Sequence, residues 1–307
     1  MAMPTSTPQP GIFDESVTTN WTQQYTVDLG ADIDALRSAL ARIRGLVEGD
    51  RGPASVVIAV GASLLGTLAP DLMPAGIRPF TAVMGTDGHS APDTQDDLLV
   101  WFGADGSDRC LLAARLARGL LDGVATLRDE TAGFTYFGHL DLTGFEDGTE
   151  NPTGDDRYDV AVVPDGPAVG SSHVLVQRWV HDLIAFEALD VSDQELVIGR
   201  TKDGSVELEP VPEASHIERV VMKDADGDER EIYRRSFPYG DTTEHGLLFL
   251  AFGADLSTFV DMLDRMYGVA DGVRDRLTDI SRAVSGAFYV ALSEEALDRI
   301  VTPSRST

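Results

Sequence analysis

The sequence predicts an α+β protein whose two halves use a similar order of short strands and helices. Strand-like and helix-like stretches alternate along the 307 residues, and a segment rich in Gly, Pro and Asp separates them between residues 143 and 167. The glycine-rich turn that opens a nucleotide-binding fold is absent, which favours an α+β sandwich over a doubly wound sheet. A chain of this length holds one large domain or two ordinary ones. We divide it near residue 150, into 1–150 and 151–307.

In the first half, apolar residues alternate with polar ones from residue 21 to 29, which is typical of a half-buried strand. Residues 33–47 place apolar side chains three or four positions apart and are followed by Gly49, the pattern of an amphipathic helix with its stop signal. The remaining elements expected in this half are strands at 54–60, 97–102 and near 134–137, and a helix at 108–121.

In the second half, the polar segment at 143–167 is expected to be a loop, and a loop this long inside a compact domain is usually functional or disordered. Ser192 and Glu195 have the spacing of a capping box at a helix start. Residues 224–228, Asp-Ala-Asp-Gly-Asp, indicate a turn between two strands. The other expected elements are strands at 172–180, 218–222, 231–235, 246–252 and 287–292, and a helix at 256–266.

The formal net charge of −27 excludes some partners. A surface with this much negative charge repels nucleic acid and anionic lipid. We therefore expect neither as a partner. The charge is typical of a highly soluble protein, and steering of cationic substrates is the alternative. No stretch approaches the roughly 18 apolar residues of a membrane span, and residues 1–10 lack the features of a secretory signal. We therefore expect a cytoplasmic protein that does not bind membranes.

Cysteine and histidine usage narrows the metal chemistry. Cys110 is the only cysteine, which excludes an intramolecular disulfide, a cysteine-cluster metal site and covalent haem attachment through C-x-x-C-H. None of the six histidines has the spacing of a multi-histidine metal site, and His173 and His181, on or beside a strand, fit structural roles. The acidic residues from Asp224 begin like a calcium loop, but Arg235 stands where its final glutamate belongs.

Residues 144–152, GFEDGTENP, form the most specific string in the chain. By composition they are a polar surface turn. In order, they resemble the G-F-x-D-G-T-x-N-P signature of the dye-decolourising peroxidases, and all seven fixed positions match. Segments along nearly the whole chain are also similar to that family, and the compact length is similar to its bacterial B-type (P-type) subfamily. These segments are PQPGI at 8–12, SAP at 90–92, VIGRTK at 197–202, SHIER at 215–219 and RRSFPYG at 234–240.

The resemblance implies two ferredoxin-like domains of the dimeric α/β-barrel superfamily. It also implies one non-covalent haem b per chain, held mainly by the second domain, with the loop after Thr143 crossing its distal face. By the same resemblance His216 is the proximal iron ligand, and Asp279 accepts its other ring N–H, which would push electron density toward the iron. The alternative for Asp279 is an acid on a helix surface.

On the distal side, the resemblance implies that Asp147 transfers the proton of hydrogen peroxide, while the permanently charged Arg234 stabilises the departing oxygen. Which of the two dominates is left open. Arg235 is the adjacent alternative, but the motif spacing selects Arg234. Ser236 is a candidate to hydrogen-bond the peroxide, or else a strand-end hydroxyl, and Arg200 pairs either with a haem propionate or with a protein carboxylate. Further candidate cofactor contacts are Gly148, Thr149, Leu248, Phe249, Phe259 and Met262, which as apolar or loop residues could equally be ordinary structure.

The function implied is a peroxidase that reduces hydrogen peroxide and, through a ferryl intermediate, oxidises small organic donors such as dyes and phenolics. The alternative is a haem-handling protein that stores, transfers or de-metallates haem. A carrier needs His216 but not Asp147 and Arg234 together, so their joint presence favours the enzyme. Relatives often assemble, so we expect a homo-oligomer. Residues 301–307 do not look like an encapsulin-targeting tail, and we expect no encapsulation.

Overall fold

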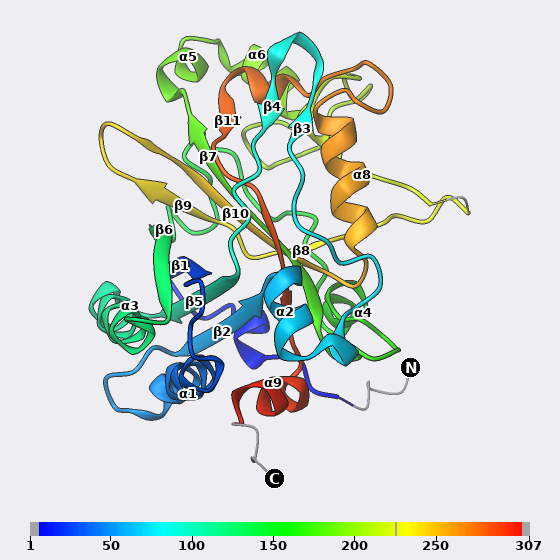
Figure 1. Ribbon diagram of the computed structural model, residues 1–307. Coiled ribbons are helices and arrows are strands. Elements are labelled where there is room, and N and C mark those ends of the chain that lie inside the picture. The colour runs from blue at the N-terminus through cyan, green and yellow to red at the C-terminus, as the bar shows by residue number, and fades with distance from the viewer. Residues whose placement is uncertain (1–5, 225, 303–307) are drawn as a thin grey trace.

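The computed structural model describes residues 6–224 and 226–302. In this part of the chain, ten strands form one sheet in the order β11-β7-β12-β2-β5-β1-β6-β9-β10-β8, and a second pairing of β7 with β10 closes the strands between them into a barrel (Figure 1). The strand pairs of this sheet are antiparallel. The protein is therefore α+β, as predicted, with a closed antiparallel barrel at its centre.

The first half of the chain contributes four of the barrel strands and the helices beside them (Figure 1). A two-stranded sheet of β3 and β4 stands apart from the barrel. The elements are β1 (Thr19–Val27), α1 (Ile33–Arg44), β2 (Ser55–Val60), α2 (Ala62–Leu68), β3 (Val83–Met84), β4 (Ser90–Ala91), β5 (Leu98–Ala104), α3 (Ser107–Leu121) and β6 (Ala125–Phe134).

The second half supplies the other barrel strands and the helices that cover their outer face. Between Phe134 and the first helix of this half, the chain runs as an irregular segment. The elements are α4 (Asp156–Ala161), β7 (Ser172–His181), α5 (Leu183–Glu187), α6 (Val191–Ile198), α7 (His216–Val220), β8 (Tyr233–Arg234), β9 (Phe237–Gly240), β10 (His245–Gly253), α8 (Leu256–Met266), the short 3₁₀ helix η5 (Arg276–Asp279), β11 (Ser281–Ala283), β12 (Ala287–Ala291) and α9 (Glu294–Val301).

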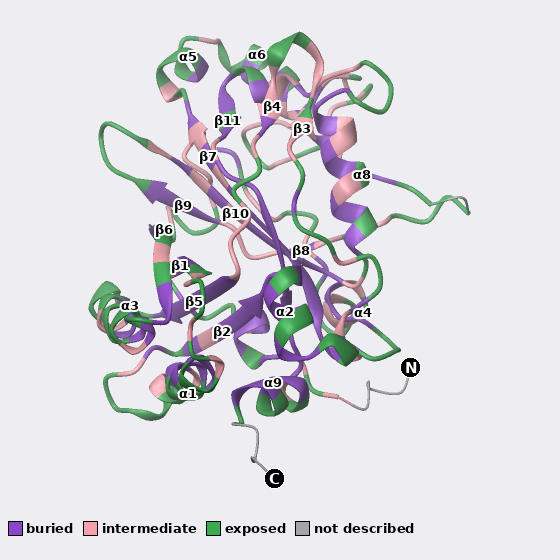
Figure 2. Cartoon of the chain, in the orientation of Figure 1, coloured by how far each residue is buried: buried purple, intermediate pink, exposed green. Residues whose placement is uncertain are grey.

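The barrel interior is filled by every second side chain of its strands, because successive side chains of a strand point to opposite faces. Val174 and Val176 of β7 and Leu248 and Leu250 of β10 are buried in this interior cluster. Figure 2 shows that much of the strands at the centre of the molecule is buried. The alternate residues of β7 and β10 therefore face the helices of the second half, which is the side on which the candidate site lies.

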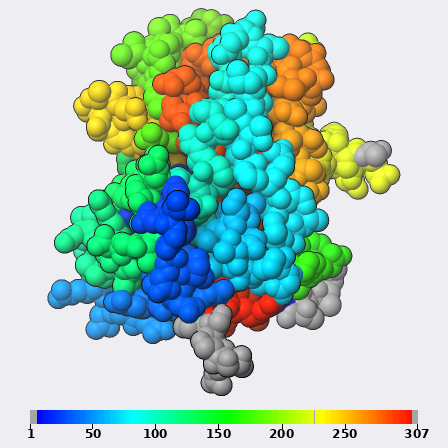
Figure 3. All heavy atoms as spheres, viewed as in Figure 1, coloured from blue at the N-terminus to red at the C-terminus, as the bar shows by residue number. Residues whose placement is uncertain are grey.

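Each half also packs a segment against the other. The C-terminal helix α9 buries Leu297 and Ile300 in the cluster formed with α1, α2 and α3. In the opposite direction, the chain after α2 runs along the face seen in Figure 3 and buries Phe80 against Phe288 and α8. Because each half packs a segment into the core of the other, the domain boundary near residue 150 stays a prediction.

Three predicted elements differ from the structure. The strand near 134–137 is wrong in position: β6 ends at Phe134, and its inward positions include Asp129 and Thr131, so apolar alternation is missing. The strand at 218–222 is wrong in type: α7 occupies 216–220, since Ile217 and Arg219 are buried there against α8. The expected capping box is two residues late: Asp190, rather than Ser192, is the N-cap and accepts the N–H of Asp193.

Residue 225 of the turn predicted at 224–228 lies outside the described residues. The residues that flank it, Asp224 and 226–228, confirm the turn. The N–H of Asp224 donates to the carbonyl of Asp228 at 2.8 Å. Residues 303–307 of the expected tail and residues 1–5 of the expected N-terminal arm also lie outside the described part of the chain. Among the described residues, no helix has the length and apolar character needed to cross a membrane.

Candidate functional site

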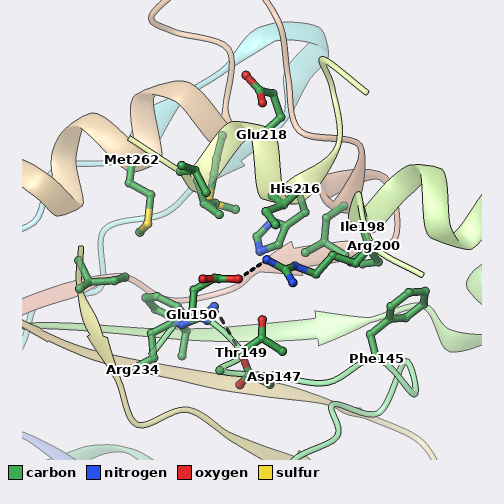
Figure 4. Close-up of a pocket in the computed structure, with 18 of the residues that line it drawn as sticks. Phe145, Asp147, Thr149, Glu150, Ile198, Arg200, His216, Glu218, Arg234 and Met262 are labelled. Carbon is green, nitrogen blue, oxygen red and sulfur yellow. Dashed lines mark hydrogen bonds and ion pairs between the residues drawn. The ribbon is translucent and has the colours of Figure 1, made fainter. Parts of the chain in front are cut away.

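A cavity of about 660 Å³ lies between the outer face of the barrel wall and the helices α7 and α8. Its side chains come from β7, β10, α7, α8, β8 and the irregular segment after β6. In Figure 4, His216 projects into it from one side, and Asp147 and Arg234 lie on the opposite side, with Met262 at one end. The cavity therefore has two chemically distinct walls, one with a carboxylate and a guanidinium and the other with an imidazole.

The wall with Asp147 is formed by the loop at 139–151, referred to below as the distal loop. Gly144 and Gly148 have φ angles of 81° and 82°, in the left-handed region that favours glycine. These turns fold the loop back on itself, and the N–H of Asp147 donates to the carbonyl of His139 at 2.8 Å. The two glycines of the GFEDGT string are thus required by the backbone path that presents Asp147 to the cavity.

Arg234 is held next to Asp147 by a two-point clasp. The Asn151 side chain accepts the N–H of Arg234 and donates to its carbonyl, each at 2.8 Å. On its other side, Arg234 pairs with Ala251 of β10, so its backbone is fixed from two directions. The guanidinium Nη1 lies 3.7 Å from Asp147 Oδ1. Asn151 and the strand pairing therefore bring a carboxylate and a permanent cation together at one wall.

The opposite wall carries His216, the first residue of α7. Its Nδ1 lies 2.7 Å from Oδ2 of Asp275, which is fully buried. Because a carboxylate can only accept, Nδ1 carries the proton and Nε2 is left as a free electron pair. The other oxygen of Asp275 accepts the N–H of Leu277 at 2.8 Å and so caps η5. Among the described residues, Nε2 of His216 has no hydrogen-bond partner.

Arg200, which also lines the cavity, is paired with carboxylates. It forms a short ion pair with Glu150, and Glu207 lies at 3.7 Å. Its Nη1 also donates to the carbonyl of Ser205 at 2.8 Å. Figure 4 shows the Arg200–Glu150 pair between His216 and Asp147. The side chain of Arg200 is thus oriented for a carboxylate, which is the kind of group that a guanidinium fork binds best.

Lys202, close to Arg200 in sequence, secures the distal loop. Its ammonium lies 5.2 Å from the ring centroid of Phe145 and 5.8 Å from that of Phe186. It also donates to Oε1 of Gln194 at 2.7 Å. Cation–π contacts of this kind are worth about 0.5–2 kcal/mol each. The string at 197–202 therefore has a structural task, to hold Phe145 of the distal loop.

The cavity satisfies the requirements of a porphyrin site. Its volume is within the range of about 300–1,000 Å³ that is usual for cofactor pockets. Apolar side chains such as Phe249, Met262 and Ile198 line it, together with a few polar groups. A neutral imidazole whose free nitrogen faces such a cavity is a common axial ligand of haem iron. The buried carboxylate behind His216 would fix its tautomer.

Comparison with known families agrees with this donor set. Residues 16–135 match the family model described as Dyp-type peroxidase, N-terminal, and residues 139–296 match Dyp-type peroxidase, C-terminal. The chain belongs to the Dyp-type peroxidase family. The enzyme is therefore a peroxidase, with the fold of two ferredoxin-like domains that its structural relatives share.

Individual relatives cover almost all of this peroxidase. The dye-decolorizing peroxidase of Mycobacterium tuberculosis is 36% identical, over 97% of this chain and 92% of its own. A dye-decolorizing protein from V. cholerae has a TM-score of 0.84 at 36% identity, covering 96% and 97%. DypB of Rhodococcus jostii, solved as a variant in complex with haem, has a TM-score of 0.87 at 34% identity, covering 92% and 95%.

Most of the residues selected from the sequence of this peroxidase lie around the one cavity. Arg235, the alternative to Arg234, points away: its guanidinium donates to the carbonyls of Ile12 and Asp14 and lies 5.2 Å from the Trp101 ring centroid. The predicted residues that line the cavity are Asp147, Gly148, Thr149, Arg200, His216, Arg234, Phe249 and Met262.

The prediction that Asp279 accepts the N–H of His216 is wrong, because Asp275 does so. Asp279 lies at the end of η5, where it pairs with Arg274 at 2.6 Å and is 3.9 Å from His89. The four-residue difference has a physical cause. Asp275 precedes η5 and its carboxylate faces the buried side, whereas Asp279 is half exposed. An aspartate directly before a short helical turn is the signal that favours Asp275.

Three other predicted contacts are outside the cavity lining. The hydroxyl of Ser236 accepts the N–H of Leu250 at 3.4 Å, so it acts as a strand-end hydroxyl. Phe259 is fully buried in the core, 6.4 Å from Phe288 between ring centroids, and Leu248 faces the barrel interior. Phe249, next to Leu248 on β10, lines the cavity because successive side chains of a strand point to opposite faces, and Met262 of α8 also lines it.

Proposed function

We propose that this Dyp-type peroxidase binds haem in the cavity, held mainly by the second half of the chain, and reduces hydrogen peroxide there while oxidising small organic donors. The observation that carries the proposal is the placement of Asp147 and Arg234, 3.7 Å apart, across the cavity from the free Nε2 of His216. When bound, haem would supply the redox chemistry, a two-electron reaction with peroxide followed by one-electron oxidation of donors.

On the Asp147 side, the chain's own residues move a proton and stabilise charge. The carboxylate of Asp147 would accept a proton from one oxygen of hydrogen peroxide and deliver it to the other, which leaves as water. Arg234 remains cationic and stabilises the negative charge that develops on the leaving oxygen. The clasp by Asn151 holds Arg234 in place before peroxide arrives, so no reorganisation is needed at the moment of bond cleavage.

On the other side, His216 would hold the iron of a bound haem through Nε2, while Asp275 accepts its Nδ1 proton. The buried carboxylate makes the imidazole a stronger donor to the metal than a histidine bonded to water. A stronger donor favours the more oxidised iron, which is the form that a peroxidase must reach.

Removing the charge of Asp275 tests this role. Asp275→Asn keeps an oxygen to cap the N–H of Leu277 but no longer accepts the Nδ1 proton as a carboxylate does. We expect the reduction potential of the bound haem to rise and the peroxide reaction to slow by about 10- to 100-fold, the usual cost of such a partner. Spectroelectrochemical titration and stopped-flow absorbance measure the two effects. Asp279→Asn is the matched control, and equal effects of both changes would overturn the assignment of Asp275.

We propose that Arg200 binds a haem propionate, in exchange for part of its pairing with Glu150. Arg200→Gln is expected to weaken haem binding by about tenfold or more, since a hydrogen bond to a charged group is worth about 1.5–3 kcal/mol. Glu150→Gln, which removes a competing carboxylate, is expected to bind haem at least as tightly as the unchanged chain. Fluorescence titration of the apoprotein with haem measures both affinities. Undiminished binding by Arg200→Gln would show that this arginine serves only its protein ion pairs.

The proposal extends to the organic electron donors and to the assembly of the protein. We propose phenolic and dye-like one-electron donors and a homo-oligomer, which steady-state assays and light scattering test. A cytoplasmic location stays a prediction. So does the absence of encapsulation, since an encapsulated Dyp-type peroxidase from Mycobacterium smegmatis is 31% identical, with a TM-score of 0.86 and coverage of 97% of this chain and 98% of its own.

A further inference from the structure

The distal loop begins with a tight turn organised by Asp141. Its Oδ2 accepts the N–H of Thr143 at 2.9 Å and the hydroxyl of the same residue at 2.6 Å. Its backbone accepts the N–H of Gly144 and donates to the carbonyl of Phe145, both at 2.9 Å. These four bonds set the direction in which the loop leaves the turn, six residues before Asp147.

The second oxygen of Asp141 is bonded to His181, the last residue of β7. Nε2 of His181 lies 3.3 Å from Oδ1 of Asp141, and Nδ1 lies 2.7 Å from the hydroxyl of Ser281. The ionised carboxylate requires Nε2 to donate, so in neutral His181 Nδ1 accepts the hydroxyl proton of Ser281. All three residues line the cavity, and His181 and Ser281 are buried.

Ser281 connects this histidine to the segment that carries Asp275. It begins β11, directly after η5, and β11 lies beside β7 near the top of Figure 1. The N–H of Asp182 donates to the carbonyl of Ile280 at 2.7 Å, which tightens the same junction. Phe145 of the distal loop and Ile280 also share one buried apolar cluster. One imidazole thus joins the loop of Asp147 to the segment behind His216.

We propose that His181 is a positioning residue of the peroxidase site, which fixes the start of the distal loop, through Asp141, against the Asp275 segment, through Ser281. The inference rests on the proposed function in one respect, the role of Asp147 in the peroxide reaction. Displacing a reacting group by about 1 Å can cost about 100-fold in rate even when the altered residue does not touch substrate. A loosened turn at Asp141 is expected to act in this way on Asp147.

The hydrogen-bonded pair of His181 and Asp141 also makes the distal loop resistant to acid. Burial raises the pKa of Asp141, but the hydrogen bond and charge of His181 and the two bonds from Thr143 outweigh it, and the pKa is lowered. A carboxylate with a lowered pKa stabilises the fold above its unfolded pKa, and this contribution is lost as the pH falls through the folded pKa. Of the nearby charged groups, Lys202 is turned to Gln194 and Phe145, and Asp182 accepts the N–H of Ala185. Without His181, the loop should therefore loosen at a higher pH.

Two substitutions of His181 separate its two bonds. In His181→Gln the side-chain amide extends to the position of Nε2 and can still donate to Asp141, whereas the shorter amide in His181→Asn reaches only the position of Nδ1. We expect amide hydrogen exchange in the haem-free protein to become roughly tenfold faster at Thr143, Gly144 and Asp147 in His181→Asn, the factor for one lost hydrogen bond. In His181→Gln, exchange should stay near that of the unchanged chain.

The haem-loaded variants supply the functional measurement. His181→Asn is expected to react with hydrogen peroxide about 10- to 100-fold more slowly at unchanged haem affinity, with the acid limb of its pH profile at higher pH. His181→Gln is expected to restore most of the rate. His173→Asn is the control, because His173 is also buried and lies near the other end of the same strand. Should His181→Asn fold poorly, Asp141→Asn breaks the same contact, since an amide cannot accept at both ends.

The outcomes are distinguishable. Unchanged loop exchange in both His181→Asn and Asp141→Asn, or equal effects of the Asn and Gln changes at residue 181, would overturn the proposal. If exchange rises as expected but Asp147→Ala itself leaves the peroxide rate unchanged, the positioning by His181 stands and the proposed role of Asp147 fails.

Discussion

Removing Asp147 and Arg234 together, as Asp147→Ala with Arg234→Leu, is expected to slow the reaction of the haem-loaded protein with hydrogen peroxide by about 10⁴-fold. General acid–base transfer contributes about 10²–10⁴ and one electrostatic donor about 10²–10³, and groups that act as a unit lose less than the product of the single effects. Stopped-flow absorbance at the Soret band measures the rate. The two single variants, measured in parallel, show which residue dominates, a question that the sequence left open.

The matched control removes an equivalent pair elsewhere. Arg299 and Asp71 form an ion pair at 2.6 Å, with more than half of each side chain exposed. Asp71→Ala with Arg299→Leu therefore deletes the same two side-chain types without touching the cavity, and its peroxide rate is expected to equal that of the unchanged protein. A double variant at 147 and 234 that reacts as fast as this control would contradict the proposed distal chemistry.

Replacing His216 by glycine is expected to abolish histidine ligation of the haem iron and to lower haem retention strongly. The substitution leaves a void the size of the ring beside Asp275, whose buried carboxylate remains in place. Added imidazole is expected to enter this void, donate its N–H to Asp275 and restore both the absorption spectrum and part of the peroxide reaction. Absorption titration with imidazole measures the recovery.

This rescue distinguishes ligation from a structural role of the histidine. His245, near the start of β10, contacts the carbonyl of Asp241 and is not among the cavity residues, so His245→Gly should change neither spectrum nor rate. A haem spectrum unaffected by His216→Gly would show that another residue ligates the iron. Loss of haem without any response to imidazole would indicate that His216 is needed for folding of α7 rather than for ligation.

The sequence predicted the cavity wall that carries Asp147 and Arg234 better than the parts that support it. The ordered string at 144–152 and the spacing around Arg234 selected residues that do meet at one cavity, and the turns with left-handed glycines that present Asp147 are encoded locally. Periodicity also located the helices at 33–44 and 256–266, where apolar side chains repeat on one face. Such features depend on near neighbours in the chain.

The features that were missed depend on tertiary contacts. His181 was interpreted as structural, yet its partners Asp141 and Ser281 are 40 and 100 residues away in sequence. Asp275 was passed over for Asp279, four positions later, because only the packing of η5 decides which carboxylate faces His216. Strand β6 lacked apolar alternation because the barrel accepts polar side chains at its inward positions.

The most direct test of the central claim is the absorption spectrum of the haem-loaded protein during titration with hydrogen peroxide. The proposed site predicts a Soret band typical of histidine-ligated haem, which shifts completely when one equivalent of peroxide per haem is added and returns when an organic donor follows. A spectrum that does not respond to stoichiometric peroxide would contradict the assignment of Asp147, Arg234 and His216 to peroxide reduction.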